Sequence, residues 1–153
     1  MAYVDGADRE MEGLSRIDPA RNAVADSRFR SALGDGGTVT PGDTIYETTY
    51  APDRLTYKAR TAKGGVAVFS EVFFPWGWTA TIDGNPAEIG RVNYLLRALK
   101  VPAGEHEIVM TFDPQSTHTA STVASVSIIL IYILLAGALV LTFRPTLLPG
   151  KKK

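Results

Sequence analysis

The chain has 153 residues and no cysteine, and its 16 Lys and Arg residues balance 16 Asp and Glu residues to a formal net charge of zero. The lack of cysteine excludes a disulfide-stapled mini-protein, a thiolate zinc site and a cysteine nucleophile. At 45% hydrophobic and 21% charged residues, the composition is also unlike that of a nucleic-acid-binding tail or a disordered chain.

Residues 1–37 are expected to form an N-terminal segment with one short helix. Residues 7–16 (ADREMEGLSR) are charged, with Met11 and Leu14 three positions apart, which predicts a surface helix that ends before Pro19. Residues 23–25 are a candidate extended piece. The glycine-rich run at 34–37 marks a flexible boundary, and it is no phosphate loop because no lysine and helix follow it.

Residues 38–115 are expected to form a β-sandwich. Short runs rich in β-branched and aromatic residues alternate with turn residues at spacings of 8–12, which is typical of an antiparallel sandwich rather than of alternating strands and helices. The spacing predicts about seven strands, at residues 44–50, 54–61, 66–74, 78–83, 87–92, 94–101 and 105–113.

The dipeptide Asp83-Gly84 is the strongest turn signal, and it predicts a hairpin between residues 78–82 and 87–92. Alternation along two of the strands also sorts side chains onto one face. The side chains that share a face are Leu55, Tyr57 and Ala59 in one strand and Ile108, Met110 and Phe112 in another.

The C-terminal part is predicted to cross a membrane. No charged residue occurs between Asp113 and Arg144, and residues 123–143 are 21 consecutive, mostly apolar residues. A helix that crosses a hydrocarbon core of roughly 30 Å needs about 20 residues. We therefore expect a polar linker at 116–121, a transmembrane helix at 122–143 and a basic tail at 144–153.

The distribution of charge predicts which side each part occupies. Residues 1–120 hold twelve basic and all sixteen acidic residues, a net charge of −4, whereas residues 121–153 carry +4. The positive-inside rule then places the C-terminus in the cytoplasm and the β domain outside, in a single-pass arrangement. The first thirty residues lack the apolar stretch of a signal peptide. Two alternatives remain: a tail-anchored protein with a cytosolic domain, or the end of a longer polytopic protein.

Residues 55–114, followed by the hydrophobic helix, resemble the C-terminal region of the YfhO family of bacterial membrane proteins. The resemblance extends weakly toward the N-terminus through Ile17-Asp18-Pro19 and residues 23–26. Its main motifs occur in order: Leu55-Thr56-Tyr57, Phe69-Ser70-Glu71, Phe74-Pro75, Gly77-Trp78, Ile82-Asp83-Gly84, Arg91, Asn93-Tyr94, Arg97-Ala98, Val101-Pro102-Ala103-Gly104, His106 and Asp113-Pro114.

Members of that family resemble polytopic glycosyltransferases that use lipid-linked sugars, with a multi-helix body and an extracytoplasmic C-terminal β domain. The resemblance implies that this β domain faces outward in the bacterial cell envelope. The helical body, which carries the acidic catalytic residues in such enzymes, has no counterpart in this chain. We therefore expect no catalytic residue here.

Four carboxylates, those of Glu71, Asp83, Glu88 and Asp113, are candidates for an acid pair in glycoside chemistry, which needs two acids about 5–10 Å apart. Asp83 is better explained as a turn former and Asp113 as a strand-end residue. Glu71 falls in a strand that reads as buried, so it needs a partner. We expect a structural ion pair between Glu71 and Arg91 or Arg97.

Aromatic residues give the main binding hypothesis. Trp76, Trp78 and Tyr94 are candidates for contact with a glycan, and Trp76 is the preferred one because it lies in a Pro-Gly turn. The alternatives are a hydrophobic core or an aromatic belt at the level of the lipid headgroups. His106 and His118 lack further ligands at metal spacing, so neither a metal nor a cofactor is expected.

The sequence thus predicts a membrane-anchored β domain that is an accessory part of a glycosyltransferase-like protein. Its expected partners are the lipid bilayer, a helical body and a cell-envelope glycan, with no nucleic acid. Two other functions stay open: an enzyme that transfers sugar from a polyprenyl-phosphate donor together with the missing helices, and a stand-alone anchored carbohydrate-binding module.

Overall fold

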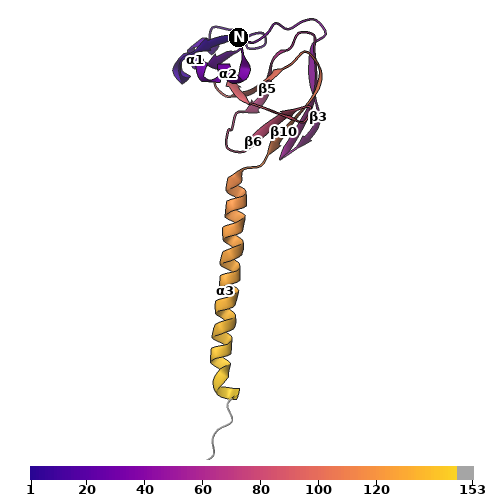
Figure 1. Ribbon diagram of the computed structural model, residues 1–153. Helices are drawn as coiled ribbons and strands as arrows, with labels where there is room; N and C mark the ends of the chain where they lie inside the picture. Colours follow the sequence, from indigo (N-terminus) through magenta and orange to yellow (C-terminus); the bar gives the residue numbers. More distant parts are fainter. Residues whose placement is uncertain (148–153) are drawn as a thin grey trace, which may run out of the picture. The chain divides into compact units, whose positions relative to one another are not determined.

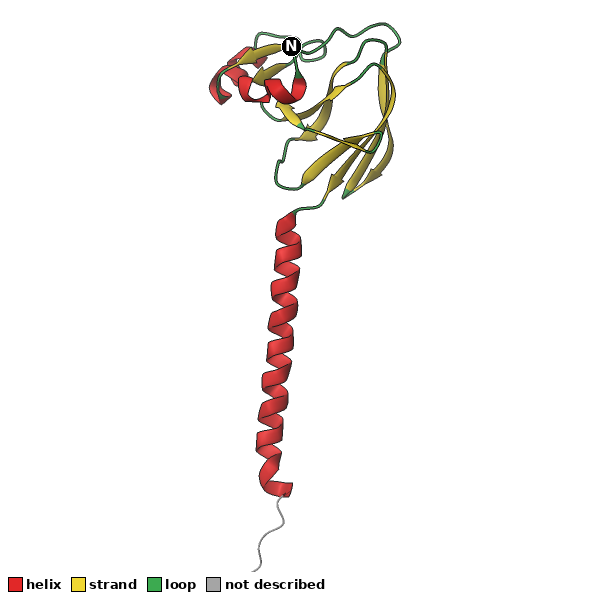
Figure 2. Ribbon diagram, in the orientation of Figure 1, coloured by secondary structure: helices red, strands yellow, loops and turns green. Residues whose placement is uncertain are grey.

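The computed structural model describes residues 1–147 and divides the chain into two compact units, residues 1–113 and a unit that begins at Pro114 (Figure 1). The first unit is a β domain, and the described part of the second forms one long helix (Figure 2). The prediction of a mainly β chain with antiparallel sheets and a C-terminal apolar helix is confirmed. The strand count is not, because the described residues form ten strands rather than about seven.

One layer of the β domain is a five-stranded antiparallel sheet with the order β3-β4-β10-β6-β7. Its strands are β3 (Thr44–Ala51), β4 (Arg54–Thr61), β10 (Gly104–Phe112), β6 (Trp78–Ile82) and β7 (Asn85–Ala87). The central strand β10 pairs with β4 from Gly104 opposite Thr61 to Thr111 opposite Arg54. On its other side, β10 pairs with β6.

The second layer is a three-stranded sheet, β5 (Gly65–Val72), β9 (Leu96–Val101) and β8 (Gly90–Val92), in the order β5-β9-β8. The two sheets share one core. Ile108 and Met110 of β10 and Leu99 of β9 have no exposed surface, and burying a side chain of this size contributes about 1.5–3 kcal/mol. The alternation predicted for β4 is confirmed, since Leu55, Tyr57 and Ala59 are buried whereas Lys58 and Arg60 are exposed.

Residues 1–37 pack on the three-stranded sheet as part of the same unit, and not as a separate segment. They form β1 (Ala2–Val4), α1 (Ala7–Leu14), β2 (Val24–Asp26), the 3₁₀ helix η1 (Ser27–Phe29) and α2 (Arg30–Leu33). The helix at α1 and the extended piece at β2 were predicted. The strand β1 was not, because its parallel pairing with β2 joins residues about twenty positions apart.

The hairpin predicted at Asp83-Gly84 is confirmed. Ile82 pairs with Asn85, and Asp83 and Gly84 have φ values of 52° and 79°, as a two-residue turn with positive φ requires. The single strand predicted over 87–92 is wrong, because β7 ends at Ala87 and β8 begins at Gly90 in the other sheet. A Cβ on Gly90 would lie 2.6 Å from Leu33, so α2 requires glycine at this crossing.

The second unit is α3 (Gln115–Leu147), which contains a 25-residue apolar window, Thr119–Phe143, with a mean hydropathy of 2.7. The helix is long and apolar enough to cross a membrane. Residues 116–121, predicted as a linker, are helical because none of them is Gly or Pro. The helix also continues past Arg144 and Pro145 to Leu147. Of the predicted basic tail, residues 148–153 lie outside the described residues.

Candidate functional site

One end of the five-stranded sheet gathers the segments closest to the point where the chain leaves the β domain, and we call it the exit end. It consists of the turn at residues 51–53, the loop at residues 73–77 and the strand end Phe112-Asp113. Phe112 N donates to Asp53 O at 2.8 Å, and Asp113 N donates to Gly77 O at 2.8 Å. A Cβ on Gly77 would lie 2.5 Å from the Phe112 ring, so this close approach requires glycine.

Four aromatic rings form a connected cluster at the exit end. The ring centroids of Trp78 and Phe112 lie 5.2 Å apart, those of Phe112 and Phe74 lie 6.2 Å apart, and those of Phe74 and Trp76 lie 5.2 Å apart. Exposure rises along this series, because Trp78 and Phe112 are half-buried, Phe74 is 42% exposed and Trp76 is 74% exposed. The cluster therefore starts in the core and ends in the solvent.

Arg97 closes the inner end of this aromatic cluster. Its guanidinium carbon lies 4.1 Å from the centre of the Trp78 ring, which is a cation–π geometry. Its Nε donates to Val72 O at 2.9 Å, and its Nη1 lies 3.6 Å from the sulfur of Met110. Arg97 is only 3% exposed, and this desolvation lowers the pKa of its guanidinium, while the charge of Glu71 opposes the shift.

The ion pair expected for Glu71 involves Arg97. Arg97 Nη2 lies 3.4 Å from Glu71 Oε2, and the Glu71 side chain is 34% exposed rather than fully buried. Arg91, the other expected partner, lies directly opposite Arg97 in the pairing of β8 with β9. Two like charges in such a position destabilise a sheet unless each is neutralised. Arg91 therefore needs a carboxylate of its own.

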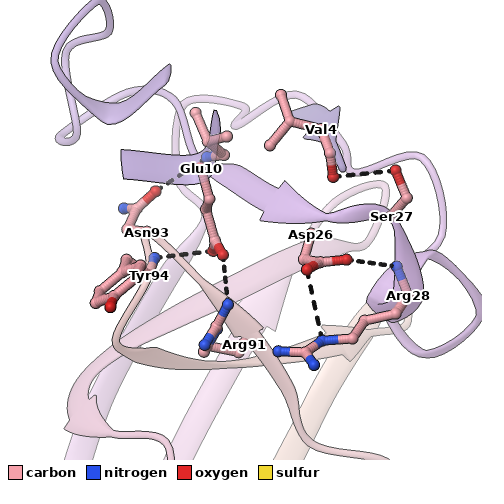
Figure 3. A network of polar contacts seen from close by, with 9 residues as sticks. Val4, Glu10, Asp26, Ser27, Arg28, Arg91, Asn93 and Tyr94 are labelled. Atoms are coloured by element: carbon pink, nitrogen blue, oxygen red, sulfur yellow. Dashed lines mark hydrogen bonds and ion pairs between the residues drawn. The ribbon is translucent and has the colours of Figure 1, made fainter. Parts of the chain in front are cut away.

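That carboxylate is Glu10 of α1, which no pattern in the sequence singles out (Figure 3). Arg91 Nη2 donates to Glu10 Oε2 at 2.6 Å, and Tyr94 N donates to Glu10 Oε1 at 2.8 Å. Glu10 has no exposed surface, although α1 was predicted as a surface helix. In the sequence, Glu10 is one acidic residue on a helix with few apolar residues. This pattern does not identify a partner 81 residues away.

Asn93 completes the attachment of the N-terminal residues to this sheet. Its Oδ1 accepts from Val24 N at 3.0 Å, and its N donates to Val24 O at 2.7 Å. Asn93 and Tyr94 both have positive φ, at 51° and 68°, and Asn tolerates this conformation better than most residues. Tyr94 is thus held by its backbone, with its ring 5.4 Å from the Arg91 guanidinium, and it packs there and not against Trp76 or Trp78.

The opposite end of the sheet, which we call the far end, is held by polar contacts. It consists of the turns at residues 62–64, 83–84 and 102–103. His106 Nδ1 lies 2.7 Å from Asp83 Oδ2, and Asp83 Oδ1 accepts from Glu107 N at 2.9 Å. The hydrogen bond with Asp83 raises the pKa of His106, and the same bond lowers the pKa of Asp83.

An apolar groove of about 170 Å³ also opens near the far end, beside Val39, Ile45 and Val66. Sites for drug-sized ligands usually measure about 300–1,000 Å³. The one carboxylate in its lining, that of Asp43, accepts hydrogen bonds from Thr40 N and Ala62 N, both at 2.7 Å. The bond from Thr40 contributes most to the lowered pKa of Asp43. This carboxylate is therefore occupied in holding the loop.

Two of the candidate carboxylates, those of Glu71 and Asp83, are held by other partners. Glu71 is paired with Arg97, and Asp83 holds the hairpin turn at the far end. Within residues 1–147, no group of three His, Asp or Glu side chains is placed to hold a metal ion. The arrangement is suited to contact through the exposed rings of Phe74 and Trp76. No family model matches the chain, and neither does any curated protein or solved structure.

Proposed function

We propose that this chain is a membrane-anchored β domain that faces away from the cytoplasm and serves as an accessory, non-catalytic part of a YfhO-type glycosyltransferase-like assembly. The observation that carries the proposal is the direct passage from sheet to apolar helix. β10 ends at Phe112 and α3 begins at Gln115, so only two residues separate the β domain from a helix of spanning length.

Polar side chains inside the apolar window support the membrane assignment. Ser127 Oγ donates to Val123 O and Thr142 Oγ1 donates to Ala138 O, both at 2.8 Å. Backbone and side-chain polar groups in a bilayer core must be satisfied inside the protein, and these bonds meet that requirement within one helix. The other hydroxyl-bearing residues of the window are Thr119, Ser121, Thr122, Ser125 and Tyr132, its remaining residues are apolar, and all of its residues are exposed.

Anchoring is tested by an alkaline carbonate wash of membranes from bacteria that express the full chain. The chain should stay in the membrane pellet. A double variant, Leu130→Lys with Leu134→Lys, should be released, because each lysine at the centre of a span costs about 2.5–3.5 kcal/mol. The matched control Ser121→Lys lies near the edge of the window, where lysine reaches the interface, and should be retained. Release of the unmodified chain would contradict the anchor.

The accessory role is tested by sugar transfer from a polyprenyl-phosphate sugar donor. The purified chain in vesicles should transfer no sugar. Transfer by the chain alone, abolished by substitution of one of its own carboxylates, would overturn the non-catalytic assignment and favour an enzyme.

A second candidate function is that of an anchored carbohydrate-binding module. The observation in its favour is the ring of Trp76, which is 74% exposed, since an exposed ring face can stack on a pyranose. In that case Trp76→Ala would weaken binding to cell-envelope glycans. An unchanged affinity would remove this candidate.

A further inference from the structure

The loop at residues 73–77 of the exit end exposes aromatic rings, whereas the carboxylates of this end, Asp53 and Asp113, lie in the turn at residues 51–53 and just after β10. Trp76 lies in the loop between β5 and β6, where its sequence neighbours Pro75 and Gly77 and its ring partner Phe74 are apolar. Phe74 in turn packs against Phe112. Sites for small polar ligands combine apolar surface with a few convergent polar groups. The apolar character of this surface calls for a partner that is itself partly apolar.

The connectivity of the chain limits how far this surface lies from the apolar helix. Phe112 touches the rings of both Phe74 and Trp78, and the apolar window begins at Thr119, seven residues later. Seven residues span at most about 25 Å even when fully extended, and Gln115 to Thr119 is helical. Any membrane that holds the helix is therefore within a short distance of the exit end.

The chemistry of the exposed rings matches that of the lipid headgroup region. Tryptophan and tyrosine are enriched at membrane–water interfaces, where an apolar ring and a polar N–H or O–H are both accommodated. Besides Trp76, the exit end carries Tyr50 at the end of β3, next to the turn at residues 51–53, and its side chain is 70% exposed. The ring planes of Phe74 and Trp76 cross at 72°, so the two do not form the flat row on which a glycan would stack.

We infer that the exit end is a lipid-contact surface, in which Trp76 and Phe74, together with Tyr50 at the same end of the sheet, rest at the headgroup level of the bilayer that holds α3. The inference rests on the proposed membrane anchor. The partner is a phospholipid surface, and the contact gives the β domain a second attachment beside the helix. Arg97, Trp78 and Phe112 support the exposed rings from the core side.

The test uses the full chain in phosphatidylcholine vesicles and the emission of its tryptophans. The chain has two, Trp76 and Trp78, so the difference between the unmodified chain and Trp76→Phe isolates the emission of Trp76 without a change in the core. Spin-labelled headgroups should quench more than half of this emission. As a control, Asn85→Trp in the Trp76→Phe background places a ring at the far end, and the same lipids should leave its emission unquenched.

Three outcomes are distinguishable. If the chain does not float with the vesicles, the anchor itself fails. If the chain floats but Trp76 is quenched no more than the ring at position 85, the lipid-contact surface is refuted while the anchor stands. If the emission of Trp76 instead responds to added envelope glycan, the surface belongs to a carbohydrate-binding module. Thermal unfolding of each variant by circular dichroism shows that the β domain remains folded.

Discussion

The two ends of the five-stranded sheet are formed by the same strands, yet the side chains at the two ends make different kinds of contact. At the far end, Asp83 and His106 pair with each other, and Asp83 also accepts from the backbone of the neighbouring strand. At the exit end, rings pack on rings and the last of them, Trp76, is left in the solvent. The polar groups of the far end bind one another, and the apolar groove near it measures only about 170 Å³, whereas the exit end exposes a large aromatic ring. This difference is the basis for the proposed lipid contact at the exit end.

The largest loss of stability is expected outside both ends, at the buried ion pair of Arg91 and Glu10. Arg91→Ala leaves the carboxylate of Glu10 buried and without its ion-pair partner, and breaking a buried pair costs about 3–5 kcal/mol. Urea unfolding of the full chain in mild detergent measures this loss. The matched control is Arg28→Ala, because Arg28 is largely exposed and lies 3.6 Å from Asp26, and exposed pairs contribute about 0–1 kcal/mol. Equal losses in the two variants would contradict the buried pair.

The next largest loss of stability is expected from a glycine substitution at the exit end, because the space around the glycines differs between the two ends. Gly77→Ala at the exit end places a Cβ against the Phe112 ring and should destabilise the β domain by about 1–3 kcal/mol, as overpacking does. At Gly65, on the opposite side of the domain, the nearest atom to an added Cβ lies at 3.7 Å, so Gly65→Ala should change stability far less. Denaturant unfolding compares the two. A Gly77→Ala variant as stable as Gly65→Ala would mean that the loop packs differently.

A smaller loss of stability distinguishes a tryptophan that stabilises the fold from one that is available for contact at the exit end. Trp76→Ala should change the free energy of unfolding by less than about 0.5 kcal/mol, because exposed substitutions rarely do more. Trp78→Ala removes a ring that contacts Phe112 and Arg97, and it should destabilise the domain clearly more. If Trp76→Ala proved as damaging as Trp78→Ala, Trp76 would be a core residue and not a contact residue.

The smallest effect concerns the far end and depends on pH. The hydrogen bond with Asp83 raises the pKa of His106, so this interaction stabilises the fold fully below the usual His pKa of about 6.5 and is lost as the pH rises through the raised value. Asp83 acts in the opposite sense, because its lowered pKa gives stability that is lost as the pH falls below about 3.8. Both effects are small at an exposed pair.

Proton NMR of the His106 ring across a pH titration measures the first of these shifts. The midpoint should lie above that of an unperturbed histidine, and Asp83→Asn should return it toward about 6.5. An identical midpoint in the two chains would show that the pair is not formed in solution.

Local signals explain why most of the sheet was predictable. Alternation and turn chemistry identified β3, β4, β5, β6, β9 and β10, together with the hairpin turn at Asp83-Gly84 and the buried faces of β4 and β10. Local patterns failed where the chain changes sheets, at residues 88–89, because only the approach of Leu33 to Gly90 reveals that crossing. They also failed at β1, whose partner lies about twenty residues away.

The candidate site was likewise predictable only where it depends on a local sequence pattern. The Pro-Gly turn marked Trp76 as the preferred candidate for contact, and its ring is 74% exposed. The sequence could not decide between Arg91 and Arg97 as the partner of Glu71, because the two arginines lie opposite each other. What separates them is Glu10, which approaches Arg91 from α1. A contact between residues 81 positions apart leaves no local trace in a single sequence.

The orientation of the chain in the membrane tests the central claim most directly. The natural chain lacks cysteine, so a single cysteine can be placed by Asn85→Cys at the far end of the β domain or by Lys152→Cys near the C-terminus. On intact bacterial cells, a membrane-impermeant maleimide should label position 85 at once and position 152 only after the cells are lysed. Protection of position 85, with labelling only after lysis, would place the β domain in the cytoplasm and contradict the account.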